Sequence, residues 1–137
     1  MKIRVLDSRA IMEWIAGRHP AGNAVGALLA EAEAGRARVL MSAINAGEVY
    51  YFLRKHHSQE LSESWRESSP TLPVTIEVPT AGEIWEAAQL KARYPIAYAD
   101  AFAAALARKY KCPLVTGDPE LRLVEGLELD WIGSPDA

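Results

Sequence analysis

The sequence predicts an α/β domain with a central, mostly parallel sheet of four to five strands. Short apolar runs rich in Val, Ile and Leu alternate with longer segments that carry apolar residues at helical spacing. This alternation favours a parallel sheet whose two faces are covered by helices. The first run, Ile3 to Leu6, ends at Asp7 just before a helical pattern. A carboxylate is therefore expected at the carboxyl end of a strand, where open α/β sheets hold their ligands.

Length and composition are those of a soluble globular protein. The 137 residues are 50% hydrophobic and 24% charged, and we expect one domain over 1–137, with 134–137 as a frayed tail. Cys112 is the single cysteine, which excludes a disulfide framework and a cysteine-based metal site. A lone cysteine fits a reducing cytoplasm, so a cytoplasmic location is expected. No apolar stretch is long enough to cross a bilayer, so no membrane association is expected.

The first half of the chain contains two predicted strands and four predicted helices. Gly35 ends the second helix, and Ser42 is a plausible N-cap of the third. The fourth helix is more polar, and Leu61 and Trp65 are its expected apolar contacts. These elements are expected as strand 3–6, helix 8–15, helix 23–34, strand 37–41, helix 43–56 and helix 58–67.

The residue pattern in the second half of the chain predicts three more strands. Residues 74–78 alternate apolar and polar side chains, which indicates a short strand near a sheet edge. Thr80 is expected to cap the next helix, with Ile84, Trp85, Ala88 and Leu90 as its apolar residues. The order expected here is loop 68–73, strand 74–78, helix 81–92, helix 97–109, strand 112–116, a short helix from 118 and strand 127–132.

Four acids stand out by their position beside predicted strand ends. Asp7 follows the first strand, Glu48 lies in the second turn of the helix after the second strand, and Asp100 lies in the first turn of an alanine-rich helix. Asp118 follows the strand that ends at Thr116. Because these positions face one edge of a parallel sheet, the four carboxylates are expected to converge on one cleft.

Each acid also has a purely structural explanation. Asp7 and Asp118 are good helix caps, and Asp100 is an acid in a first turn that the helix dipole favours. Glu48 is close in sequence to Arg54 and Lys55, which are possible ion-pair partners. The hydroxyls of Ser8 and Thr116 are expected either to orient the acids or to act as local caps.

Convergent carboxylates predict a divalent cation, because like charges at short range do not all stay ionised without one. Ligands that are all oxygen favour Mg²⁺, for which Mn²⁺ can substitute, over Zn²⁺. Mg²⁺ is commonly shared between carboxylates and substrate phosphates, so phosphate-ester chemistry is expected. The net charge of −3 means that any surface for nucleic acid must be a local basic patch.

The segments around these acids resemble the PIN-domain nucleases and, in size and layout, the toxin of VapBC toxin–antitoxin pairs. They are Val5 to Ser8, Ser42 to Val49, Tyr98 to Ala107 and Leu114 to Asp118, in the family's order. The resemblance implies a Rossmann-like α/β/α sandwich and an endoribonuclease that hydrolyses RNA with a metal-activated water. It implies Asp7 and Asp100 as the foremost metal ligands, completed by Glu48 and Asp118.

The resemblance also implies a homodimer and a cognate VapB-type antitoxin. Family members often carry a small hydroxyl residue two positions after the first Asp, where this chain has Arg9. Arg9 either contacts a phosphate of the RNA or obstructs the usual arrangement. Other basic residues that are candidates for RNA contact or for plain surface charge are Arg18, Arg54, Lys55, His56, His57, Lys91 and Arg93.

Two other functions remain open from the sequence. One is a catalytically silent PIN-like module that binds RNA or protein. The other is a phosphoacceptor receiver domain, which needs an Asp at the end of its middle strand and a late Lys that this chain does not offer. The tryptophans are expected in a core or an interface rather than as platforms for bases, and they are Trp14, Trp65, Trp85 and Trp131.

Overall fold

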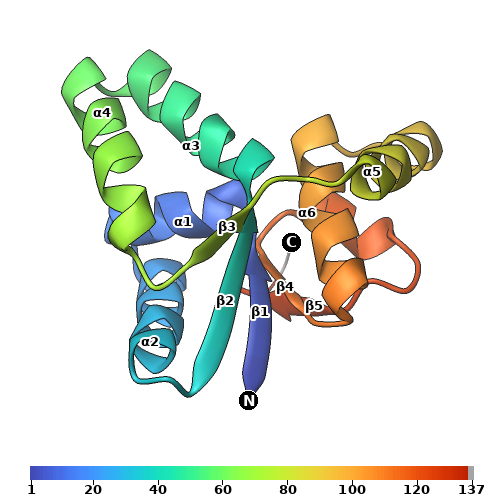
Figure 1. Cartoon of the computed structure of the whole chain (residues 1–137), viewed down its shortest axis with the longest axis horizontal. Coiled ribbons are helices and arrows are strands. Elements are labelled where there is room, and N and C mark those ends of the chain that lie inside the picture. Colours follow the sequence, from blue (N-terminus) through green and yellow to red (C-terminus); the bar gives the residue numbers. More distant parts are fainter. Residues whose placement is uncertain (136–137) are drawn as a thin grey trace.

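A five-stranded parallel sheet forms the centre of the molecule in the computed structural model, which describes residues 1–135 (Figure 1). The strand order is β3-β2-β1-β4-β5, so the first strand is central and the predicted edge strand does lie at an edge. The predicted tail 134–137 falls partly outside the described residues. The strands are β1 (Lys2–Leu6), β2 (Ala37–Ser42), β3 (Thr75–Glu77), β4 (Leu114–Thr116) and β5 (Leu129–Trp131).

Helices cover both faces of this sheet, with α1 to α4 on one side and α5 and α6 on the other (Figure 1). Val5 and Leu40 pack in the core under α5 and α6, whereas Leu6 and Met41 pack in the core under α1 to α4. This alternation is the period of two of a strand that is buried on both faces. The helices are α1 (Ser8–Ile15), α2 (Ala21–Glu33), α3 (Ala43–His56), α4 (Gln59–Ser68), α5 (Ala81–Arg93) and α6 (Tyr98–Tyr110).

Strand β1 sets the register of the acidic segments. Val5 is level with Leu40 of β2 on one side and with Leu114 of β4 on the other. Because all three strands run in the same direction, the residues that follow them emerge at one edge of the sheet. The fold therefore brings the ends of β1, β2 and β4 together, as the α/β prediction required.

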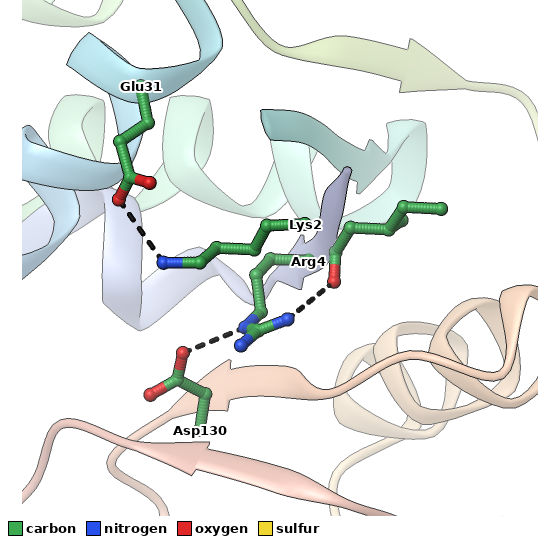
Figure 2. Close-up of polar contacts among 5 residues, drawn as sticks. Lys2, Arg4, Glu31 and Asp130 are labelled. Carbon is green, nitrogen blue, oxygen red and sulfur yellow. Dashed lines mark hydrogen bonds and ion pairs between the residues drawn. The ribbon is translucent and has the colours of Figure 1, made fainter. Parts of the chain in front are cut away.

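Polar contacts tie β1 to β5 and to α2 (Figure 2). Arg4 Nε lies 2.9 Å from Asp130 Oδ2 of β5, and Arg4 Nη1 donates to the Ile3 carbonyl oxygen at 2.9 Å. Lys2 Nζ lies 3.2 Å from Glu31 Oε1 of α2. The Lys2 pair is exposed and contributes at most about 1 kcal/mol, so these contacts mainly orient β5 and α2 relative to β1.

The predicted start of the second helix was wrong by two residues. The helix begins at Ala21, and Gly22 lies in its first turn. A Cβ on Gly22 would lie 2.4 Å from the Glu13 carbonyl oxygen, so the glycine is needed where α2 packs on the end of α1. Residues 68–73, predicted as a loop, include a 3₁₀ turn over Ser69–Thr71.

The predicted apolar faces of two helices need correction. In α4, Trp65 is buried but Leu61 is 37% exposed. In α5, Ile84 is 43% and Trp85 is 71% exposed, whereas the predicted Leu90 is buried and shares the face turned to α6 with Ala87. The small side chain of Ala87 lets α5 approach the alanine-rich α6 closely. No helix within residues 1–135 has the length and apolar character that a membrane crossing requires.

Candidate active site

One cavity at the carboxyl ends of the strands collects the four predicted acids. It has a volume of about 310 Å³, and its walls come from the ends of β1 and β4 and from α1, α3 and α6. The predicted residues Ser8 and Arg9 also line it, whereas Thr116 is fully buried behind it. The residues that line the cavity are Asp7, Ser8, Arg9, Met12, Glu13, Arg18, Glu48, Phe52, His56, His57, Asp100 and Asp118.

Asp7 serves as a helix cap while it also lines this cavity. Its Oδ1 accepts a hydrogen bond of 2.8 Å from the Ala10 backbone N–H, which satisfies a free donor of the first turn of α1. The residue is only 1% exposed. Burial raises its pKa to about 6, although hydrogen bonds with Thr116 and Ala10 act in the opposite direction. Capping thus holds the carboxyl group rigidly at the strand end.

Glu48 reaches the cavity from α3 and bonds to α1. The Ser8 hydroxyl donates a short hydrogen bond to Glu48 Oε1. The alternative that Glu48 pairs with Arg54 or Lys55 is wrong, because Arg54 donates instead to the Tyr50 hydroxyl at 3.1 Å. Ser8 therefore holds Glu48 on the side of the cavity where Asp7 lies.

Asp100 is the most perturbed carboxyl group of the site. Its pKa rises to about 8, first because it is buried and next because of a hydrogen bond with Asp118. The negative charges of Asp7, Asp118 and Glu48 raise it further. At neutral pH, in the absence of a cation, Asp100 therefore holds a proton that it can share with Asp118.

Asp118 also acts as a cap, as its alternative explanation suggested. Its Oδ1 accepts a hydrogen bond of 3.0 Å from the Glu120 N–H at the start of the 3₁₀ helix Pro119–Leu123. Its own N–H donates to Thr116 Oγ1 at 3.1 Å. Thr116 thus contacts both Asp7 and Asp118, which places one hydroxyl group between two acids of the cavity.

The sequence reasoning missed Asn45, which lies one turn before Glu48 in α3. Asn45 is fully buried, and its Nδ2 donates to the Ala99 carbonyl oxygen at 3.0 Å, beside Asp100. Its Oδ1 is buried and has no partner among residues 1–135. A polar side chain among the apolar residues of a buried helix face is the signal that could have identified it.

Two arginines stand at the border of the cavity. Arg9 is exposed and forms no ion pair or side-chain hydrogen bond within residues 1–135, although its charge acts on Asp7. Arg18 Nη1 lies 3.1 Å from Glu13 Oε1, and the Arg18 side chain is 68% exposed. Positive charge is therefore available directly beside the acids.

The chemistry of the donor set fits a hard divalent cation. All four acids offer oxygen, and the pKa values of Asp7 and Asp100 are raised mainly by burial and further by the charges of neighbouring acids, which a bound cation would compensate. Within residues 1–135, no three such side chains converge closely enough to hold one ion as they stand. Glu48 and Asp118 line the cavity and accept hydrogen bonds from Ser8 and from the Glu120 N–H, so cation binding requires the carboxyl groups to move closer together.

Comparisons with known proteins identify the family and the fold of the chain. The sequence profile of the PIN domain matches residues 4–127. A search of curated proteins found no match. Among solved structures, VapBC2 from Rickettsia felis, crystallised with a DNA fragment from its promoter, has a TM-score of 0.72 at 18% identity, covering 93% of this chain and 97% of that chain.

Two further structures have the same fold. VapC20 from Mycobacterium tuberculosis, described as a Sarcin-Ricin loop cleaving toxin, has a TM-score of 0.72 at 17% identity, covering 92% of this chain and 98% of its own. FitAcB from Neisseria gonorrhoeae has a TM-score of 0.61 at 20% identity, with coverages of 92% and 95%. At such identities the likeness concerns the fold.

Proposed function

Because the chain belongs to the PIN domain family, we propose that it is a metal-dependent endoribonuclease of the VapC toxin type. The observation that carries this proposal is the single cavity in which Asp7, Glu48, Asp100 and Asp118 meet beside an unpaired arginine. Membership of this family excludes the receiver-domain alternative. Among its structural neighbours, VapC20 is a toxin that cleaves the Sarcin-Ricin loop, which supports RNA as the substrate class.

The acids would hold Mg²⁺, or Mn²⁺ in its place, with Asp7 and Asp100 as the foremost ligands and Glu48 and Asp118 completing the site. A bound ion supplies charge that activates a water and stabilises the scissile phosphate during hydrolysis. Asp100 must release its proton before it can ligate, since its pKa of about 8 keeps it protonated in the metal-free protein at neutral pH.

The remaining side chains orient these acids and the substrate. Asp7 is fixed by its cap to Ala10, and Thr116 orients it from beneath. Ser8 holds Glu48 through its hydroxyl group. Arg9 is placed to contact a phosphate of the RNA, because its guanidinium group is exposed and unpaired at the border of the cavity.

The same proposal includes the partners of a toxin–antitoxin module. Solved relatives include VapBC2 from Rickettsia felis and a toxin–antitoxin complex from Klebsiella pneumoniae. We extend this to a homodimer and a cognate VapB-type antitoxin that inhibits cleavage, with residues 1–137 forming one domain. The first test is whether a small open reading frame lies next to the gene, and the second is whether its co-expressed product binds this chain and inhibits cleavage.

Replacement of Asp7 by Asn tests the catalytic assignment. Asn caps helices as well as Asp does, so the fold should be retained, while the lost charge should reduce RNA cleavage by about a thousandfold or more. The matched control is Glu67→Gln, which removes one negative charge from an exposed residue of α4. Cleavage of tRNA, rRNA and mRNA is measured with and without Mg²⁺.

Two outcomes contradict the proposal. Wild-type rates for Asp7→Asn in metal-replete buffer would show that the acid is not needed for chemistry. Binding of RNA by the wild-type protein without cleavage in either Mg²⁺ or Mn²⁺ would favour the catalytically silent binding module.

A further inference from the structure

A second cavity of about 490 Å³ adjoins the acidic cavity. The two cavities share Arg9, Glu13 and Arg18 in their walls, so they form one trough that is divided by the side chains of α1 and the segment after it. The second cavity is otherwise enclosed by the connection between α1 and α2, the loop after β4 and residues 132–135. Its walls contain none of the four acids of the first cavity.

The two cavities differ in charge, and this difference decides where a phosphate group of RNA can bind. Without a cation, the four acids of the first cavity repel a phosphate. The shared border instead carries two guanidinium groups against one acid, Glu13: Arg9 has no ion pair within residues 1–135, and Arg18 pairs with Glu13 at 3.1 Å but is 68% exposed. A guanidinium group binds phosphate oxygens in a fork geometry, so this border is the preferred place for a phosphate next to the acidic cavity.

The loops after β4 and β5 form one wall of the second cavity and pack closely against each other. A Cβ on Gly117 would lie 3.1 Å from Gly133 Cα, and a Cβ on Gly133 would lie 2.9 Å from the Gly117 carbonyl oxygen. The loops after β4 and β5 are therefore in direct backbone contact. Pro119 and Ile132 add apolar surface on this wall, against which the face of an unpaired base can pack.

We propose that the second cavity binds the nucleotide that adjoins the scissile phosphate of a single-stranded RNA. Arg9 and Arg18 bind its phosphate, and its base packs near Ile132 and Pro119. This inference rests on the proposed ribonuclease function and assigns a substrate subsite to it. It requires unpaired RNA, because a base within a duplex is not free to enter such a cavity.

The test is equilibrium binding of a labelled single-stranded RNA oligomer to the Asp7→Asn chain in Mg²⁺, over a series of salt concentrations. The plot of log affinity against log salt has a negative slope. Arg9→Ala and Arg18→Ala should each make this slope less steep by about 0.7, the value for one lost phosphate contact on a single strand. The matched control is Arg36→Ala, since Arg36 is exposed, without a side-chain partner within residues 1–135, and precedes β2 at the other end of the sheet.

A second variant tests the shape of the cavity. Ala21→Trp places a large side chain in the second cavity, and it should weaken RNA binding about tenfold or more, while Mn²⁺ affinity measured without RNA stays the same. The subsite is wrong if the Arg9 and Arg18 variants behave like Arg36→Ala, or if Ala21→Trp binds RNA normally. If the wild-type chain neither binds nor cleaves RNA, the ribonuclease proposal itself fails.

Discussion

Asn45 donates a hydrogen bond of 3.0 Å from its Nδ2 to the carbonyl oxygen of Ala99. The contact joins α3, which carries Glu48, to the first turn of α6, which carries Asp100. Helix α6 begins after Ala97, which has no side chain able to cap it. Asn45 is therefore the side chain that fixes the distance between two acids that lie 52 positions apart in the chain, at 48 and 100.

We expect Asn45→Ala to separate the two acids slightly. The free energy of unfolding should fall by about 1–2 kcal/mol for the lost buried hydrogen bond and the space left behind. Mn²⁺ affinity should fall about tenfold, as is usual when a group that orients a ligand is removed. Asn45→Ser keeps a shorter donor, so its stability and its Mn²⁺ affinity should lie between those of Asn45→Ala and the wild type. Unchanged Mn²⁺ affinity together with reduced stability would leave Asn45 a purely structural role.

The stability of the metal-free protein should depend on pH through Asp7 and Asp100. Their pKa values in the folded protein are about 6 and about 8, against 3.8 as the ordinary value. The folded state therefore binds more protons than the unfolded state between these values, and stability falls as pH rises from about 4 to 8. The raised pKa of Asp7 alone should lower the free energy of unfolding by roughly 3 kcal/mol over this pH range, at 1.36 kcal/mol per unit of pKa difference.

Urea unfolding in EDTA at pH 5 and at pH 8 measures this effect. Asp100→Asn should flatten the pH dependence, since its side chain carries no titrating proton. Mg²⁺ should restore stability at pH 8 and have little effect at pH 5, where protons occupy the ligands. Equal stability at both pH values in the wild-type chain would contradict the raised pKa values of these buried carboxyl groups.

Ser8→Ala tests the orientation of Glu48. Loss of the hydroxyl donor frees Glu48 Oε1, so we expect metal affinity to fall between tenfold and a hundredfold. Stability should change by only about 1 kcal/mol. Isothermal titration with Mn²⁺ provides the measurement, and Ser68→Ala on α4 is a control that also removes a serine hydroxyl. If both variants bind Mn²⁺ as the wild type does, Glu48 does not depend on Ser8.

Substitution of Trp65 should lower the free energy of unfolding strongly, whereas substitution of Trp85 should leave it nearly unchanged. Trp65 is 6% exposed and donates from Nε1 to the Ala46 carbonyl oxygen at 2.9 Å, so Trp65→Ala should cost about 3–5 kcal/mol. Trp85 is 71% exposed, and Trp85→Ala should stay within about 0.5 kcal/mol at low protein concentration. A loss that grows with protein concentration would instead place Trp85 in the expected homodimer interface.

Features decided by neighbouring residues could be predicted from the sequence. Ser42 caps α3 through the Ile44 N–H, and the predicted bounds 43–56 are those of the helix. Asp7 follows β1 directly and Asp118 follows β4 after one glycine, so the topology of a parallel sheet was enough to place them at one edge. The two alternatives for Asp7, a helix cap or an acid of the cleft, needed no long-range information.

Features decided by packing could not be predicted in this way. The start of α2 depends on how closely Gly22 approaches Glu13, and the buried face of α5 depends on the alanines of α6. The second cavity is formed by segments around residues 9–21 and around residues 117–135, so no local sequence pattern predicts it. Ser8 could be predicted as a hydroxyl that orients an acid, but not that the acid is Glu48, because the two residues lie 40 positions apart in the chain.

The backbone contact between Gly117 and Gly133 limits how the protein can be re-engineered. Any side chain at either position would push the two loops apart and displace Asp118, which follows Gly117 directly. Libraries intended to alter substrate preference should therefore leave both glycines untouched. Ile132 and Pro119, whose side chains line the same wall without forming this contact, are the positions at which to begin.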